Sequence, residues 1–317
     1  VSSIEYSYQD HFTIADEVIT ADPITTYQVK GGALYNVNEN LGVFINSGYV
    51  QKAPILDNVI TYDGVVATDP DNEKFLHNEV GVNFGTQKLG VRVSAYDTDW
   101  QDRNLTKSVQ TGQGSSGDTD VIFLKGVNQK HQGLEIETKI QPNDMVELDL
   151  IASFGNWKFE GDADGTYQEN EYNDEGQVIG YQTTDYAYAL DGLYVGDMPQ
   201  TAYILGVTLK PVKGLRLQAL YKTYDKNYSD WSPDAREIED GVADRSQVWE
   251  APGYSKLDLH ASYKLPIKGY DISLNAHVFN ALDEVFVQDA VDNSKYNGWG
   301  SKEHLAHNAE VFLGTPR

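Results

Sequence analysis

The sequence predicts an all-β protein whose strands form a transmembrane antiparallel up-and-down β-barrel. Apolar and polar residues alternate over long runs, short turns and long polar connections follow one another regularly, and no segment approaches 18 consecutive apolar residues. The last observation excludes transmembrane helices, whereas a tilted strand crosses the hydrocarbon core with about 9–11 alternating residues. A soluble sandwich or propeller is the alternative, because it would bury the same apolar rows between protein layers.

The hairpin between residues 251 and 283 shows the alternation most clearly. One row of its first arm is apolar: Leu257, Leu259, Ala261, Tyr263 and Leu265. The intervening row is polar: Lys256, Asp258, His260, Ser262 and Lys264. The second arm alternates in the same way from residue 271 to 278, and Pro266 with Gly269 makes a tight reversal. Period two is typical of strands, so we expect the leucine row to face lipid and the histidine row to face a polar interior.

The rest of the chain repeats this unit. Residues 1–9 alternate weakly. Four further hairpins follow in order: 24–35 with 41–49, 80–84 with 91–95, 134–140 with 146–154, and 203–209 with 215–221. A last strand begins in residues 305–314. This interpretation gives about twelve strands, the last one incomplete.

The connections alternate between two kinds. Every short turn carries Gly, Pro or Asn, and every long connection is polar; the long ones are residues 10–23, 51–75, 101–126, 157–198, 227–251 and 284–304. Outer-membrane barrels have this asymmetry, with short periplasmic turns and long external loops. An open sheet of about twelve strands would leave two edges unpaired in lipid. We therefore expect residues 1–317 to be the C-terminal half of a larger barrel.

Composition narrows the possible partners. The chain has 48 acidic and 24 basic residues, a net charge of −24, which argues against nucleic acid because phosphates would be repelled. It has no cysteine, which excludes disulfides, thiolate metal sites and cysteine nucleophiles. The mean hydropathy of −0.48 fits a barrel and a soluble protein equally well.

Several stretches resemble one family, the TonB-dependent receptors of Gram-negative outer membranes. The first is GGALYNVNENLGVFINSGYVQKAPILDNV, and the second is HNEVGVNFGTQKLGVRVSAYDTDWQDR, which contains the step Glu79-x-Gly81. The third, GVNQKHQGLEIETKIQPND, contains Gly133-x-Glu135. The fourth pairs YSKLDLHASYKL with VFNALDEVF, as in the family's penultimate hairpin, whose second strand ends in an Asn-hydrophobic-hydrophobic-Asp step, here Asn280 to Asp283. The resemblance extends from about residue 24 to residue 317, in the family's usual order.

The resemblance implies a barrel of 22 strands and active uptake of a scarce, bulky solute: a siderophore, a vitamin, an oligosaccharide or a peptide. It also implies the outer membrane of a Gram-negative bacterium, its lipid, and the TonB complex acting through an N-terminal plug as partners. A surface lipoprotein that closes over the mouth is a further candidate partner. Two features depart from the family: no plug or TonB-contacting segment is recognisable in residues 1–317, and the chain stops at GTPR instead of an aromatic residue. We expect residues 1–317 to be the C-terminal portion of the barrel, without a plug domain.

Two other functions remain open at this point. A passive porin-like channel would share the barrel but would lack a plug. A soluble glycan-binding β protein would share the alternation and the aromatic residues. The sequence predicts no enzyme and no cofactor, because the seven histidines are scattered and the neighbours His260 and Ser262 have no evident acidic partner for a catalytic triad.

The long connections carry the candidate substrate-binding residues. They are all aromatic: Tyr186, Tyr188, Tyr194, Trp231, Trp249 and Trp299. Rings above an external mouth could stack on a sugar, a chelate or a peptide, and the alternative is that the loops pack on one another.

Acidic residues also gather in these connections. The segment GDADGTYQENEYNDEG has six carboxylates and no base, and residues 229–250 have seven acids and two bases. Asp162 and Asp164 are weak calcium candidates, but no EF-hand spacing follows them, so a solvated acidic loop is the alternative. Such a rim would disfavour anionic solutes unless metal or cationic groups intervene.

Overall fold

The computed structural model describes residues 1–9, 18–60, 66, 70–111, 118–172, 178–294 and 303–316. Strands dominate this part of the chain, and its only helical pieces are the 3₁₀ turns Leu56–Asn58, Pro233–Ala235 and Ala306–Asn308. No helix within the described ranges is long and apolar enough to cross a bilayer.

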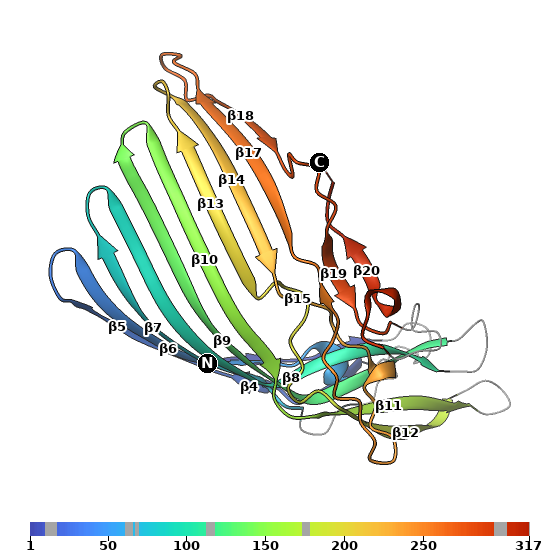
Figure 1. Ribbon diagram of the computed structural model, residues 1–317. Helices are drawn as coiled ribbons and strands as arrows, with labels where there is room; N and C mark the ends of the chain where they lie inside the picture. The colour runs from blue at the N-terminus through green and yellow to red at the C-terminus, as the bar shows by residue number, and fades with distance from the viewer. Residues whose placement is uncertain are drawn as a thin grey trace.

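One large antiparallel sheet organises the molecule (Figure 1). Along its main path the strands follow chain order: β5 (Gln28–Asn36), β6 (Leu41–Lys52), β7 (Glu73–Gly85), β8 (Leu89–Thr111), β9 (Asp118–Asn143), β10 (Val146–Phe159), β13 (Thr201–Leu209), β14 (Leu215–Asp225), β17 (Tyr254–Lys264) and β18 (Ser273–Val278). Neighbours in sequence are neighbours in space, as an up-and-down topology requires. The predicted hairpins are therefore confirmed.

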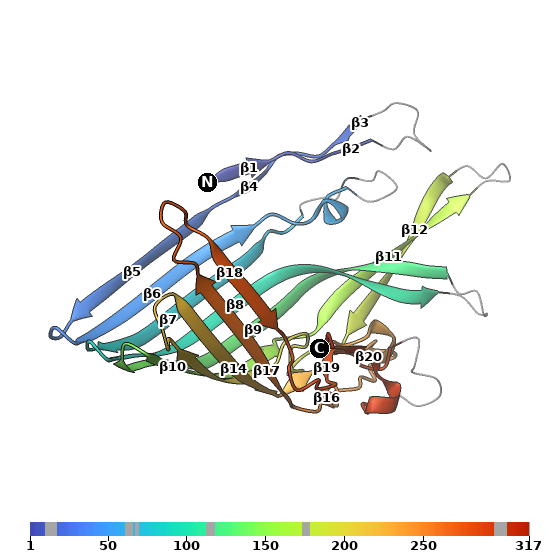
Figure 2. The same ribbon diagram turned by 90° about the horizontal axis from the view of Figure 1, so that it is seen from above.

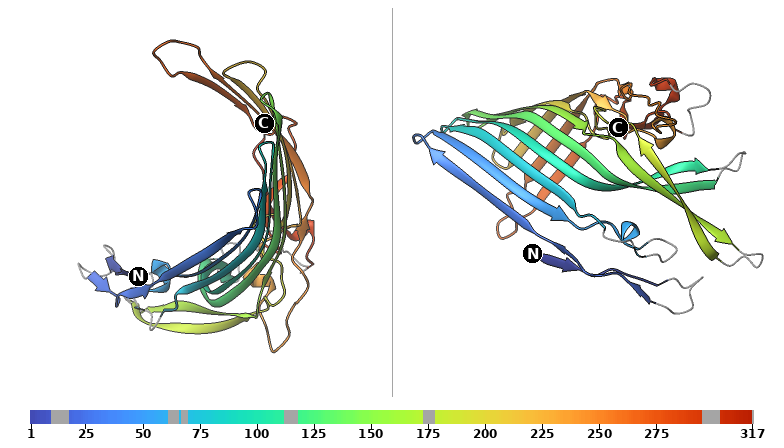
Figure 3. Two further views of the ribbon diagram at one scale, coloured as in Figure 1. Left: turned by 90° about the vertical axis from the view of Figure 1, so that its left-hand side faces the viewer. Right: turned by 90° about the horizontal axis from the view of Figure 1, so that it is seen from below.

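The sheet is a single curved layer, and Figure 3 shows its arc from the side. Strand register places directly paired residues on the same face, so apolar side chains form rows that cross the sheet. One such row is Val43, Val82, Val93, Ile136, Ala152 and Tyr203. Residues of this face are half exposed, as at Ile45 (54%) and Val80 (52%). No second sheet covers the face in the described ranges, which rules out the sandwich alternative.

The opposite face is polar and cross-linked. Arg92 pairs with Glu79 at 2.9 Å, and Asn46 donates a hydrogen bond to the same carboxylate at 2.9 Å. Further along the sheet, Lys222 pairs with Asp258 at 2.7 Å. The alternation seen in the sequence therefore separates two chemically different faces, which is the arrangement of a barrel with an apolar outside and a polar lumen.

Two glycines in the family-like steps accommodate aromatic rings on this polar face. A Cβ on Gly81 would lie 2.4 Å from the ring of Phe44, and a Cβ on Gly133 would lie 2.4 Å from the hydroxyl of Tyr96. A side chain at Gly81 would also lie 2.6 Å from the carbonyl oxygen of Val93, so glycine is required there, whereas a side chain at Gly133 would displace the Tyr96 ring. The indole nitrogen of Trp157 then donates a hydrogen bond to the Tyr96 hydroxyl at 2.9 Å.

Several segments differ from the sequence prediction, and the expected loops 10–23 and 284–304 also contain short strands. The connection expected at residues 101–126 is largely strand where the structure describes it, because β8 and β9 continue as a paired extension beyond a register shift near Trp100. Cross-strand hydrogen bonds satisfy the backbone whatever the polarity of the side chains, so the polar pattern hid the extension. The connection expected at residues 157–198 likewise contains a hairpin, β11 (Ala163–Tyr172) with β12 (Val178–Tyr188), paired to β9.

The last strand also differs in its partner. It is shorter than the expected 305–314, and as β20 (Glu310–Leu313) it pairs with β19 (Val287–Val291) outside the large sheet. At the other end of the chain, β1 (Ser2–Ile4) pairs with β4 (Ile24–Thr26), and β2 (Ser7–Gln9) pairs with β3 (Val18–Thr20). Figure 2 shows this ribbon running on from β5.

Candidate functional site

The long connections gather at one end of the sheet, which we call the loop end (Figure 1). A buried apolar core lies there, formed by β9, β10, β11, β12 and the segments that follow them. Its members are Ile122, Leu124, Val127, Phe159, Ala163, Tyr188, Leu190, Leu193, Tyr228, Trp231 and Val248. The long connections therefore pack on one another as a folded structure.

This core completely buries two of the six aromatic candidates for substrate binding. Tyr188 and Trp231 are each only 1% exposed, and their ring centroids lie 5.6 Å apart. The Lys107 ammonium lies 5.1 Å from the Trp231 ring centroid and forms an ion pair with Asp230. In this conformation both rings belong to the loop core, so neither presents a face to a solute.

The other candidates lie nearer the surface. Tyr186 is partly buried and stacks on Tyr188 with centroids 6.3 Å apart. Tyr194 is partly buried, stacks on Tyr228 at 4.2 Å, and has the Lys158 ammonium 4.7 Å from its ring centroid.

Trp249 is also partly buried, and its carbonyl accepts hydrogen bonds from the amide (2.9 Å) and hydroxyl (3.0 Å) of Ser229. β15 (Asn227–Tyr228) and β16 (Glu250–Ala251) pair beside this contact. Trp299 falls outside the described residues. Substrate contact by these four rings stays a prediction.

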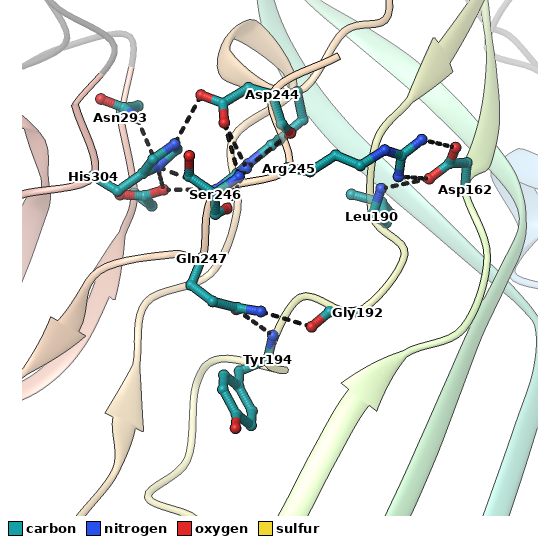
Figure 4. Close-up of polar contacts among 12 residues, drawn as sticks. Asp162, Leu190, Gly192, Tyr194, Asp244, Arg245, Ser246, Gln247, Asn293 and His304 are labelled. Atoms are coloured by element: carbon teal, nitrogen blue, oxygen red, sulfur yellow. Dashed lines mark hydrogen bonds and ion pairs between the residues drawn. The ribbon is translucent and has the colours of Figure 1, made fainter.

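A buried polar cluster fastens two of the long connections together (Figure 4). Arg236 is fully buried and donates to the carbonyls of Asp244 (3.1 Å) and Ser246 (2.7 Å) and to the carboxylate of Asp292 (3.3 Å). His304 lies between two carboxylates, with Nε2 3.0 Å from Asp244 and Nδ1 in contact with Asp292. We call Arg236, Asp244, Asp292 and His304 the loop clasp.

Hydrogen bonds and nearby charges in the loop clasp favour the charged forms of the Asp244 carboxylate and the His304 imidazole. Burial by itself lowers the pKa of His304, but hydrogen bonds to Asp292 and Asp244 outweigh it and raise that pKa above its usual value. Burial would raise the pKa of Asp244, but hydrogen bonds from Ser246 and His304 lower it to about 2. The imidazole of His304, which lies between two carboxylates, therefore ties residues 227–251 to residues 284–304.

A second set of contacts ties the segment beside the loop clasp to the β12–β13 connection and to the residue before β11 (Figure 4). The Gln247 side chain accepts a hydrogen bond from the amide of Tyr194 (3.0 Å) and donates one to the carbonyl of Gly192 (2.7 Å). Arg245 donates to both oxygens of Asp162, at 2.9 and 2.7 Å.

These contacts bear on the two calcium candidates. Both carboxylate oxygens of Asp162 bind a guanidinium, and Asp164 lies exposed in β11. Among the described residues no group of three or more His, Asp or Glu side chains could hold a metal ion. The arrangement gives the calcium prediction no support.

Sequence reasoning missed the residues that hold the loop end together. In the sequence, Arg236 is one of only two basic residues among seven acidic ones between residues 229 and 250. A basic residue surrounded by acidic ones was the only sign that it forms ion pairs. No local sequence signal marked Asp292, His304 or Gln247, because their hydrogen-bond partners lie 12 to 60 positions away along the chain.

Comparison with known proteins gives one family. Residues 6–281 match the family described as TonB dependent receptor-like, beta-barrel. No curated protein matches the sequence.

Solved structures show the same fold at low sequence identity. The ferric-catecholate import receptor Fiu from E. coli K12 is 14% identical with a TM-score of 0.52, over 96% of this chain and 35% of its own. The copper transporter OprC is 14% identical with a TM-score of 0.55, over 94% of this chain and 38% of its own. BauA, the ferric preacinetobactin receptor from Acinetobacter baumannii, is 14% identical with a TM-score of 0.52, over 96% of this chain and 36% of its own. The chain thus spans 35–38% of the length of these structures.

Proposed function

This chain belongs to the TonB-dependent receptor β-barrel family, and we propose that it is the C-terminal portion of a receptor that takes up a scarce, bulky solute across the outer membrane of a Gram-negative bacterium. Transport would be driven by TonB acting through a plug domain elsewhere in the full-length protein. Outer-membrane lipid along the apolar face and a surface lipoprotein over the loop end are further proposed partners.

The two-faced sheet is the observation that carries this proposal. Its apolar face is a continuous band of half-exposed side chains, and its polar face is held by ion pairs such as Lys222–Asp258. A soluble sheet of this size would leave too much apolar surface in water, whereas a bilayer would cover the band. The folded loop end then supplies the surface that a solute meets first.

The charge of the loop end supports a choice among solute classes. Residues 160–200 contain ten acidic residues and no base, and the two bases among residues 229–250 already pair with carboxylates, Arg236 with Asp292 and Arg245 with Asp162. The resulting negative potential would repel polyanionic solutes. We infer that the cargo is neutral or cationic, or is an anion whose charge is offset by a bound metal.

The aromatic candidates divide into two groups in this proposal. Tyr186, Tyr194 and Trp249 are partly exposed and would contact the cargo directly. Tyr188 and Trp231 would reach it only after the loop core opens, because both are buried.

A transport assay tests the proposal. Cells carrying the full-length gene should accumulate or grow on one member of a panel of siderophores, vitamins, oligosaccharides and peptides, and deletion of tonB should abolish that uptake. Uptake that persists without TonB would instead support the porin-like channel. Heat-modifiable migration on a gel, with extraction only by detergent, separates the barrel from a soluble glycan-binding protein.

A further inference from the structure

Two histidines lie side by side on the polar face of the β17–β18 hairpin. His260 in β17 and His277 in β18 occupy directly opposite positions. Their Nδ1 atoms are 2.8 Å apart and their ring centroids 5.0 Å apart. His260 is partly buried and His277 is exposed, so both rings can be reached from solvent on that face.

Strand register explains why the imidazoles meet. The amide of Leu265 donates to the carbonyl of Ile272, so these residues form a hydrogen-bonded pair at the turn. Paired positions alternate between hydrogen-bonded and non-hydrogen-bonded along an antiparallel ladder, which places His260 and His277 in a non-hydrogen-bonded pair. Side chains are closest in such pairs, with Cα atoms about 4.5 Å apart. The backbone therefore holds both rings within reach of a common ligand.

The pair lines an open hollow that Arg216, whose guanidinium donates to the hydroxyl of Thr208 at 3.3 Å, also lines. Gln218 on β14 lies directly beside His260 in the sheet, and the Phe279 ring lies 5.7 Å from the ring of His260 and 6.2 Å from that of His277. The carboxylate of Asp258, two positions along the strand, is already bound by Lys222 and by the amide of Asn280. The described part of the chain offers no third imidazole or carboxylate to this site.

The distance between the two nitrogens bears on which ions would fit. With metal–nitrogen bonds of about 2.0 Å, two nitrogens in adjacent positions of a square plane lie about 2.8 Å apart, whereas two corners of a tetrahedron lie about 3.3 Å apart. The observed 2.8 Å is the length of the hydrogen bond in the metal-free pair, and it shows that both Nδ1 atoms come close enough to reach one ion of either geometry. Imidazole ligands in a tetragonal arrangement are typical of Cu²⁺ and Ni²⁺, whereas Zn²⁺ prefers the tetrahedron.

We propose that His260 and His277 chelate a divalent first-row transition metal ion through their Nδ1 atoms, with water or a small ligand at the other positions. In the metal-free pair one Nδ1 carries a proton and donates it to the other. Binding requires that proton to move to Nε2 of the same ring, which leaves both Nδ1 lone pairs for the metal. The site joins β17 to β18 and does not depend on the proposed transport role.

Electron paramagnetic resonance with Cu²⁺ tests this directly. The full-length protein, purified in detergent and given one equivalent of Cu²⁺, should show an axial spectrum with splitting from two nitrogen nuclei. His260→Gln and His277→Gln should each reduce the splitting to that of one nitrogen. In competition with glycine, each substitution should weaken Cu²⁺ binding by at least about tenfold.

His77→Gln is the matched control, because His77 lies on the same face of β7 and its Nδ1 contacts the hydroxyl of Thr98 (2.7 Å) instead of a second imidazole. That variant should bind Cu²⁺ as the unmodified protein does. Heat-modifiable migration of each variant shows that the fold is intact. A spectrum without two-nitrogen splitting in the unmodified protein would overturn the proposal without any variant. Equal affinity in His260→Gln, His277→Gln and the unmodified protein would also overturn it.

Discussion

The sheet and the loop end are stabilised in different ways. Side chains of the sheet are half exposed on its apolar face, and its polar face relies on surface ion pairs such as Arg92–Glu79. The loop end has a closed interior, where Trp231 is 1% exposed and Arg236 is fully buried. The sheet therefore depends on what surrounds it, whereas the loop end depends on contacts within the chain. Substitutions should separate the two regions.

The largest effect is expected from Arg236→Ala. The substitution removes three hydrogen-bond partners and leaves the buried Asp292 carboxylate without its guanidinium. Breaking a buried ion pair from one side costs about 3–5 kcal/mol when the remaining charge has no other partner, and the contact of Asp292 with His304 offsets part of that cost. Limited proteolysis in increasing urea should show cleavage within residues 227–251 and 284–304 at a lower urea concentration, while heat-modifiable migration of the barrel is retained. Loss of the folded barrel itself would show that the two regions are not independent.

The next effect belongs to the sheet. Leu259→Arg places a charge on the apolar face, where Leu259 is 40% exposed and pairs with Val278. An arginine facing lipid at mid-depth costs about 2–4 kcal/mol, so membrane assembly should fall sharply. His260→Arg, one position away on the polar face, should assemble at the normal level. Counting heat-modifiable protein in membrane fractions compares the two. Normal assembly of Leu259→Arg would contradict the assignment of the faces.

The same contrast explains how far the sequence could predict the structure. Period two separates Leu259 from His260 because each residue's face depends only on its place in the alternation, so faces and hairpins could be predicted. Tyr188 and Trp231 have no such local signal. Their burial depends on contacts between segments more than forty positions apart, and a ring in a polar loop looks the same whether it packs inward or faces a solute. Functional assignments from the sequence are therefore least certain where the solute would bind.

A smaller effect is expected from pH acting on the loop clasp. The pKa of His304 in the folded protein lies above its ordinary value of 6.5, so its contribution to stability is complete below about pH 6.5 and is lost as the pH rises through the raised pKa. Asp244, with a pKa of about 2, contributes above about pH 4 and loses its contribution only in strong acid. Arg236 and Asn293 also face the imidazole and do not titrate in this range.

Proteolysis of the loop end should therefore become faster as the pH rises through the raised pKa of His304. His304→Gln should remove this dependence, because glutamine does not titrate. His307→Gln should keep it, since His307 is exposed and lies 3.9 Å from Glu303. A pH dependence that survives His304→Gln would place the titrating group elsewhere.

The smallest effect is expected from Arg245→Ala, which compares two arginines in one connection. Arg245 binds both oxygens of Asp162, which is better hydrogen-bond geometry than Arg236 makes with Asp292, but its side chain is 49% exposed and that of Asp162 is 34% exposed. Water and salt screen such a pair, and Asp162 keeps its hydrogen bonds from the amides of Leu190 and Asp191. The urea concentration at which proteolysis begins should stay within error of the unmodified protein, and any difference at low ionic strength should disappear in salt. If Arg245→Ala lowered this urea concentration as much as Arg236→Ala does, the bidentate geometry of an ion pair, and not its burial, would determine the stability of the loop end.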